Sequence, residues 1–207
     1  MSHVTCDITI SLDGYSAGPN QSLDQPFGDG VGDGEELHSW MFDHAEDHAA
    51  EIAAITDAGA FVMGRNMFDP GRGEWDLAWR GWWGEDPPYH APVFVLTHHE
   101  REPLEMQGGT TFHFVTGGLD EALARAREAA RGRNVAVAGG ATTVNEFLAA
   151  GLIDELRLHV APVVLGLEGA VRLLDGVGRL ELEAVGARCA PEVTHLVYRR
   201  RGLTPAG

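Results

Sequence analysis

The stretch VAVAGGATTVNEFLAAG, residues 135–151, reads as a strand, a glycine turn and a helix in succession. Residues 135–138 are a short, uncharged apolar run, which is typical of a strand buried on both faces of a parallel sheet. Apolar residues then recur at helical spacing over 144–148, and Gly151 stands where a helix end favours glycine. The pattern predicts that Gly139-Gly140 forms a turn between a strand and a helix.

Such a turn suits the binding of an anion. Glycine lets another molecule approach the backbone closely, and the first N–H groups of the following helix, with its dipole, favour a phosphate. Thr142 and Thr143 add hydroxyl donors. A second reading fits the same residues: a tight turn whose threonines cap the helix. Neither the G-x-G-x-x-G fingerprint of dinucleotide-binding folds nor the P-loop pattern is present.

Strand and helix patterns alternate along the rest of the chain. Strand-like runs cover Val4–Leu12, Ala60–Met63, Pro92–Thr97 and Thr111–Val115, and helical spacing covers Leu37–Ile55 and Asp120–Ala130. Three further strand-like runs with no helix between them follow Asp154, namely LRLHVAPVVLG, LELEAV and VTHLVYRR. The order predicts one α/β domain over residues 1–207, with a mostly parallel sheet that finishes in an antiparallel hairpin.

Two segments have no regular pattern. Gly18–Glu36 is rich in glycine and aspartate but lacks the calcium-loop spacing, so we expect a mobile surface loop. Asp69–His90 holds four of the five tryptophans. A loop so aromatic packs on the core, lies at a subunit interface or forms a wall beside a bound ring.

Composition limits the classes of function. The 207 residues carry a formal net charge of −16, and all fifteen basic residues are arginine. A surface so acidic repels nucleic acid and anionic membranes, so we expect neither as a partner. Cys6 and Cys189 match no disulfide framework or zinc spacing, and both are interpreted as reduced core thiols. With no signal sequence or membrane span in the chain, this predicts a cytoplasmic protein.

Four motifs together resemble a known family. VAVAGGATTVNEFLAAGLIDEL with HVAPVVLG is similar to the dihydrofolate reductase-like superfamily, and more closely to the C-terminal reductase domain of bacterial riboflavin biosynthesis and its stand-alone relatives. ITISLDGYSAGP, FVMGRNMF and APVFVLTHH resemble the first, second and third strands of that fold, in the expected order. The resemblance covers nearly the whole chain and implies a three-layer dihydrofolate reductase-like fold.

The resemblance also implies one NADPH laid across the carboxyl edge of the sheet. The residues implied at the pyrophosphate and nicotinamide are Gly139, Gly140, Ala141, Thr142 and Thr143. Those implied at the adenosine and its 2′-phosphate are Gly64, Arg65, Asn66, Thr97 and His98, while Thr9, Ala17 and Gly18 border the nicotinamide. Each group directly follows a predicted strand, where open α/β sheets bind ligands. Arg65 with His98 and His99 forms a basic pocket that can prefer NADPH over NADH.

The substrate is less determined. Ala138 stands where the riboflavin-pathway reductases carry a substrate-binding glutamate, which leaves their substrate open for this chain. Trp40, Asp43, His44 and Asp47 on the first long helix are candidates for substrate contact, and no catalytic residue is identified. We expect an NADPH-dependent reductase of a small pterin-like or riboflavin-precursor-like heterocycle, or of a related C=N or C=O compound.

Three further expectations concern alternatives and assembly. His44 and His48 could share a metal with Asp47 or Glu51, but HAEDH matches no zinc-protease motif, so we expect no metal. A ligand-binding protein without turnover is the other alternative. The apolar strands at the end of the chain and the Trp75–Trp83 segment favour a homodimer.

Overall fold

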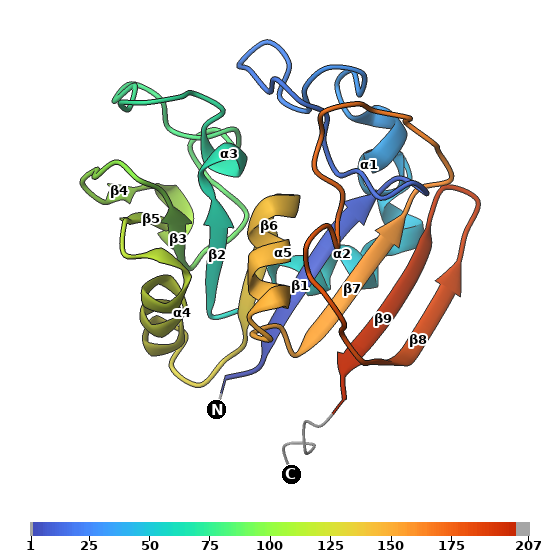
Figure 1. Cartoon of the computed structure of the whole chain (residues 1–207). Helices are drawn as coiled ribbons and strands as arrows, with labels where there is room; N and C mark the ends of the chain where they lie inside the picture. The colour runs from blue at the N-terminus through green and yellow to red at the C-terminus, as the bar shows by residue number, and fades with distance from the viewer. Residues whose placement is uncertain (1, 202–207) are drawn as a thin grey trace.

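The computed structural model describes residues 2–201, and all nine strands in that range belong to one sheet. Their order is β4-β5-β3-β2-β6-β1-β7-β9-β8, as Figure 1 shows from left to right. The strands are β1 Val4–Ile10, β2 Ala60–Gly64, β3 Pro92–Leu96, β4 Leu104–Glu105, β5 Thr111–Val115, β6 Val135–Gly139, β7 Glu155–Val160, β8 Leu182–Cys189 and β9 Thr194–Arg200. The helices are α1 Glu35–Phe42, α2 Ala49–Thr56, α3 Arg65–Phe68, α4 Gly118–Ala129 and α5 Ala141–Ala149, with short 3₁₀ turns η1 Ala45–His48 and η2 Gln107–Gly109.

The sheet is parallel at its centre and antiparallel at both edges. Strands β5, β3, β2, β6, β1 and β7 pair in parallel, while β4 pairs antiparallel with β5. At the other edge β7, β9 and β8 pair antiparallel, and β8 and β9 form the hairpin predicted for the end of the chain. The predicted mostly parallel α/β fold with an antiparallel finish is confirmed.

Helices cover both faces of the sheet, which makes three layers. The near face in Figure 1 carries α4 over β2, β3 and β5 and α5 over β6, and both helices contribute to the main apolar core. Helices α1 and α2 lie behind β1 and β7. The back of β2, β3 and β5 is covered instead by the tryptophan-rich segment, because Trp75, Trp79 and Trp83 pack against a second apolar cluster there. This segment therefore serves as core packing within the chain.

Two sequence-based expectations were wrong. The helix expected over residues 37–55 is broken at His44, whose backbone is not helical (φ −123°, ψ 29°). The break turns His48 inward, where its ring is fully buried against His195 of β9. Cys189 is exposed on the edge strand β8, so only Cys6 is a core thiol.

Within residues 2–201, no helix is long and apolar enough to cross a membrane.

Candidate functional site

The glycine turn, Gly139 and Gly140, joins the carboxyl end of β6 to the amino end of α5. Gly139 has φ +123°, a conformation that only glycine adopts readily, and its peptide bond to Gly140 is cis. Gly140 has φ −74°, which any residue can adopt. A Cβ built on Gly140 meets no atom of residues 2–201 within 4 Å. The backbone of Gly140 does not require glycine, and the space beside it is left open by the protein.

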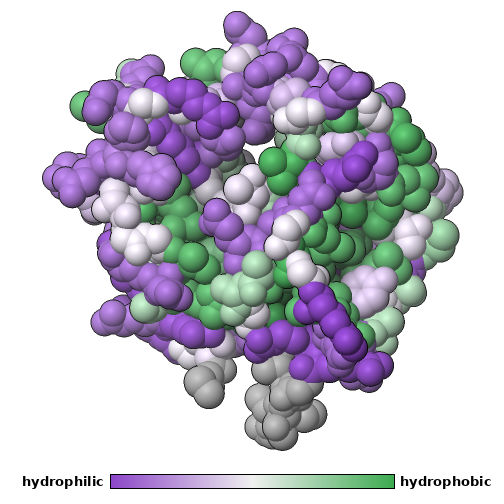
Figure 2. Space-filling view, viewed as in Figure 1, coloured by the Kyte–Doolittle hydropathy of each residue, from purple (hydrophilic) through white to green (hydrophobic). Residues whose placement is uncertain are grey.

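The first turn of α5 borders this open space. Gly140 caps the helix without any side-chain hydrogen bond, so the first N–H groups of α5 can donate to another partner. Thr142 is exposed, whereas Thr143 is buried with its hydroxyl beside Gly64 at the end of β2. Figure 2 shows the surface hollowed directly above this helix end. Free amides, a helix dipole and room for close approach are the features that a pyrophosphate needs.

A second hollow, of about 210 Å³, runs along the outer face of α5. Glu146 and Asp175 line it together with Thr142 and Asn145. Because two carboxylates face this hollow, it suits an anion poorly. We therefore place the candidate anion site at the glycine turn and not along the outer face of the helix.

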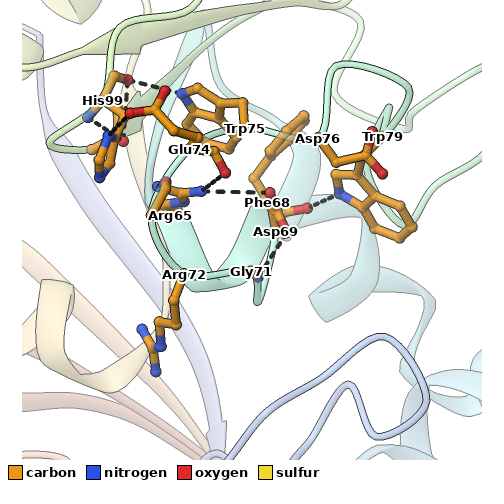
Figure 3. Close-up of polar contacts among 12 residues, drawn as sticks. Arg65, Phe68, Asp69, Gly71, Arg72, Glu74, Trp75, Asp76, Trp79 and His99 are labelled. Atoms are coloured by element: carbon orange, nitrogen blue, oxygen red, sulfur yellow. Dashed lines mark hydrogen bonds and ion pairs between the residues drawn. The ribbon is translucent and has the colours of Figure 1, made fainter.

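Arg65 begins α3 at the end of β2, but its guanidinium is already engaged. It donates to the backbone carbonyls of Gly73 (2.5 Å) and Glu74 (3.4 Å), and it lies 3.9 Å above the ring of Trp75. Asp69 adds an ion pair at 3.8 Å. We call this group the arginine corner; Figure 3 draws it with His99, whose carbonyl accepts the Trp75 indole N–H at 2.9 Å. Arg65 therefore anchors the tryptophan-rich segment to the sheet edge.

Arg72 is a cation at the same edge that sequence reasoning missed. Its side chain is exposed and points away from the arginine corner in Figure 3. It donates to the side-chain oxygen of Asn66 at 3.0 Å, which places it beside a predicted site residue. His98, at the end of β3, is exposed, while the Thr97 hydroxyl accepts the N–H of His99 at 3.1 Å. Arg72 and His98 are thus exposed basic side chains at this edge with room for a phosphate.

The loop after β1 is held in place by Asp13. Its carboxylate accepts the Ser11 hydroxyl and the backbone N–H groups of Leu165 and Gly166. Burial alone raises the pKa of Asp13, but these hydrogen bonds outweigh it and hold the pKa at about 2. Gly18 packs so tightly on the backbone of Asp29 that a Cβ has no room. Of the other predicted residues here, Thr9 is buried on β1 and Ala17 is partly exposed in the loop.

The four substrate candidates on the first helical region are not brought to one surface. Asp43, His44 and Asp47 are exposed on the outside of the α1–η1 segment. Trp40 is fully buried and packs its ring against His48, His159 and His195. The break in the predicted helix is the physical reason, because it changes which residues face the sheet.

A small cavity of about 50 Å³ lies next to the glycine turn, on the face of the sheet covered by α2. Its lining residues are Asp7, Ile55, Met67, Tyr89, Ala136, Val137 and Ala138. The Met67 sulfur also lies 3.5 Å from where a Cβ on Gly139 would sit, so the cavity adjoins the turn. Ala138 leaves this space open, and the only carboxylate in the lining comes from Asp7 on the neighbouring strand. Sequence reasoning missed Asp7 because an aspartate within an apolar strand carries no motif.

Three histidines lie in hydrogen-bond contact behind Asp7. His159 Nδ1 is 2.7 Å from His195 Nδ1, and His195 Nε2 is 2.8 Å from His48 Nδ1. We call His159, His195 and His48 the histidine chain. Burial, together with the nearby His159, lowers the pKa of His195 to about 4, so its ring is neutral at pH 7. The chain runs from His159, beside Asp7, to the buried His48, which Arg188 of β8 contacts.

His44 and His48, the two histidines considered as metal ligands, differ in burial. His44 is exposed, whereas ligand atoms of His48, Glu51 and His195 lie within 4.8 Å of one another. Arg188 already engages two of these residues, since it donates to Glu51 at 2.7 Å and its Nη2 lies 2.7 Å from His48 Nδ1. A guanidinium at this position places a cation where a metal would need to lie, so we describe the group as a hydrogen-bonded network.

The comparisons with known proteins agree with this geometry. The family model of the RibD C-terminal domain matches residues 2–196. The chain belongs to this family. RibD C-terminal domains are NADPH-dependent reductases of riboflavin biosynthesis, so the family is one of enzymes.

Individual relatives support the same fold. A crystal structure from Shewanella sp. PV-4, of a protein named for riboflavin biosynthesis, shares 26% identity and a TM-score of 0.64, covering 96% of this chain and 99% of the other. The Thermotoga maritima diaminohydroxyphosphoribosylaminopyrimidine deaminase/5-amino-6-(5-phosphoribosylamino)uracil reductase is 15% identical with a TM-score of 0.56, and the match covers 96% of this chain and 56% of that one. The uncharacterized protein YyaP of Bacillus subtilis is 23% identical, covering 96% of this chain and 95% of YyaP. The predicted dihydrofolate reductase-like architecture is confirmed.

Proposed function

We propose that this protein is an NADPH-dependent reductase that acts on a small heterocycle, or on a related compound with a C=N or C=O bond. The observation that carries the proposal is the open space at Gly140. A residue with ordinary backbone angles, no neighbour within 4 Å of its Cβ position and free helix amides beside it fits a ligand that approaches the backbone.

Different residues at the carboxyl edge of the sheet would bind different parts of the cofactor. Gly140 and the first turn of α5, with Thr142 and Thr143, would hold the pyrophosphate. Arg72 and His98, supported by Asn66 and the arginine corner, would face the 2′-phosphate. Thr9 and the loop that holds Ala17 and Gly18 would border the nicotinamide. When bound, the cofactor supplies a hydride, and this chain supplies the orientation and the shelter from water.

The cavity beside the turn is too small, at about 50 Å³, to hold a whole ring, but its lining indicates the surface that a substrate would contact. Its wall is mainly apolar, from Ile55, Met67 and Ala138, with the carboxylate of Asp7 as a polar exception. A flat ring with a few polar atoms matches such a lining. Ala138 in place of the glutamate of riboflavin-pathway reductases favours a substrate different from theirs, since a carboxylate is missing at that position.

The direct test has two stages. Calorimetric titration of the purified protein with NADPH and NADH should give binding, with NADPH the tighter ligand. A panel of pterins, flavins, ribosylaminopyrimidines and conjugated imines or carbonyl compounds should then include one that oxidises bound NADPH. Failure to bind either dinucleotide would refute the proposal. Binding without oxidation by any compound would favour the alternative of a ligand-binding protein without turnover.

We also propose a homodimer formed through the end of the sheet. The edge strand β8 is exposed over nearly its whole length, and Figure 2 shows hydrophobic residues gathered where β9 and β8 lie. Val185 is an exposed apolar side chain on β8 itself, and Val164, Val171 and Leu174 are exposed in the segment between β7 and β8. Burying such an edge and patch against a second copy removes apolar surface from water. Light scattering at micromolar concentration should return twice the chain mass, and a monomer mass would reject the proposal.

A further inference from the structure

We propose that Asp7 and His159 together hold a proton at the wall of the cavity and are the catalytic acid of the reduction, with the histidine chain fixing where that proton lies. The inference rests on the proposed reductase function. It assigns the proton donor, which neither the sequence nor the family resemblance identifies.

The first observation is two buried polar atoms that face each other without partners. The side chain of Asp7 is 5% exposed and that of His159 is 4% exposed. Asp7 Oδ1 lies 3.6 Å from His159 Nε2, and neither atom has a hydrogen-bond partner within residues 2–201. The other oxygen of Asp7 accepts from Arg157 at 3.4 Å. Because unpaired buried polar groups are costly, such atoms are retained where they interact with something else.

The second observation is the direction of the histidine chain. Arg188 can only donate, so its contact at 2.7 Å makes His48 Nδ1 an acceptor. His195 must then donate through Nε2 to the same atom, which leaves its Nδ1 as an acceptor. His159 therefore donates through Nδ1 to His195. The free side of His159, Nε2, is thus turned toward the carboxylate of Asp7.

That arrangement favours a proton on His159 Nε2. A bare Nε2 lone pair is repelled by the carboxylate oxygen 3.6 Å away, whereas a protonated Nε2 forms an ion pair with it. Asp7 itself lines the cavity, so its carboxyl group connects the proton on His159 to the cavity wall. The low pKa of His195, about 4, keeps the middle of the chain neutral at pH 7.

The other titratable group in the cavity is a weaker candidate. Tyr89 also lines the space, but burial raises the pKa of its phenol far above the usual range, which makes it a poor acid near neutral pH. The charged or titratable groups on the elements packed around Asp7 are Cys6, Glu51, Tyr89, Glu155, Arg157 and His159.

The step balances in atoms and charge. Reduction of a C=N bond forms one C–H bond from a hydride and one N–H bond from a proton, and the C=N π bond breaks. A bound nicotinamide cofactor would supply the hydride and would leave oxidised. The proton would come from the His159–Asp7 pair, which would recover a proton from solvent once the product has left the cavity. For a carbonyl substrate the proton goes to oxygen instead.

Two measurements test the proposal. Asp7→Asn should lower turnover by about 100-fold or more, the usual contribution of a general acid, while NADPH affinity stays within about twofold. Asp33→Asn, on an exposed loop, is the matched control and should behave as the unmutated protein. Turnover of Asp7→Asn close to that of the control across the pH range would overturn the assignment.

The second measurement needs no turnover. Nitrogen-15 NMR of labelled histidine in the protein without cofactor should show both ring nitrogens of His159 protonated at neutral pH. His195→Gln, which replaces a positioning residue, should shift these signals and alter the pH profile of turnover. A bare Nε2 on His159, or one equivalent of zinc retained after dialysis, would overturn the proposal even if no substrate were found. If instead the dinucleotides fail to bind while His159 is doubly protonated, the reductase function fails and the proton site remains.

Discussion

The glycine turn and the arginine corner lie at the same edge of the sheet, yet the binding group is open to a ligand at the first and occupied by the protein at the second. At Gly140 the protein leaves the backbone open and places nothing within 4 Å of the Cβ position. At Arg65 the guanidinium is taken up by two carbonyls, a carboxylate and an indole ring. The backbone at Gly140 keeps its binding capacity when the chain folds, whereas the guanidinium of Arg65 is occupied by groups of the same chain.

The largest effect is expected at the arginine corner. Trp75→Ala removes ring contacts to Phe68 and Phe114, the cation–π contact of Arg65 and the bond to His99. We expect unfolding free energy, measured in urea, to fall by about 3 kcal/mol, as for other large aromatic truncations. Leu77→Ala, an exposed residue of the same segment, is the control and should change it by less than about 0.5 kcal/mol. Equal stabilities of the two variants would show that the corner does not anchor the segment.

The next effect separates the two glycines of the turn. Gly139→Ala forces a side chain into φ +123° and should cost about 1–3 kcal/mol of unfolding free energy. Gly140→Ala should change it by less than about 0.5 kcal/mol, because φ is −74° and the space is free. Thermal denaturation of both variants measures the difference. Equal losses at both positions would mean that the whole turn is needed only for its shape.

The two arginines at this edge should also differ. Arg72→Ala should lower the preference for NADPH over NADH about tenfold, since a charge-assisted contact contributes about 1.5–3 kcal/mol. Its melting temperature should not change, because the side chain is exposed. Arg65→Ala should lose both cofactor preference and stability. Calorimetric titration of both variants with NADPH and NADH measures the preference. An unchanged preference in Arg72→Ala would mean that Arg65, and not Arg72, contacts the 2′-phosphate.

The smallest effect concerns Asp13, which is engaged within the fold as Arg65 is. Its pKa of about 2 lies below the value of about 3.9 for an unfolded chain. The carboxylate therefore adds stability above about pH 4, and this contribution disappears as pH falls toward 2. The stability difference between the unmutated protein and Asp13→Asn, measured in urea, should shrink over that interval. A difference that stays constant with pH would contradict the hydrogen bonds assigned to Asp13.

Sequence alone predicted the parallel sheet and the glycine turn because both depend on local patterns. Residues 135–138 form an apolar run without charged residues, and a helical pattern begins directly after Gly139-Gly140. The arginine corner was not predictable, since Trp75 and the carbonyl of His99 reach Arg65 only through tertiary packing. The helix break at His44 was not predictable for the same reason, because it depends on the tertiary packing of His48 against His195.

Asp7 was missed for a related reason. Its significance depends on Ala138 across the strand pair and on His159 from β7, which are more than 130 residues away in the chain. Strand alternation does place Asp7 and Thr9 on the face opposite Cys6 and Ile8. That face could have been recognised as polar from sequence, but the cavity beside it could not.

The central claim is that Gly140 is kept free for a cofactor, and Gly140→Val tests it most directly. The melting temperature of the variant should stay within about 2 °C of the unmutated protein, because its backbone angles suit valine and no neighbour is displaced. Calorimetric titration should detect no NADPH binding, since the side chain would occupy the space needed by the cofactor. A folded Gly140→Val protein that binds NADPH with normal affinity would contradict the cofactor site and the reductase function built on it.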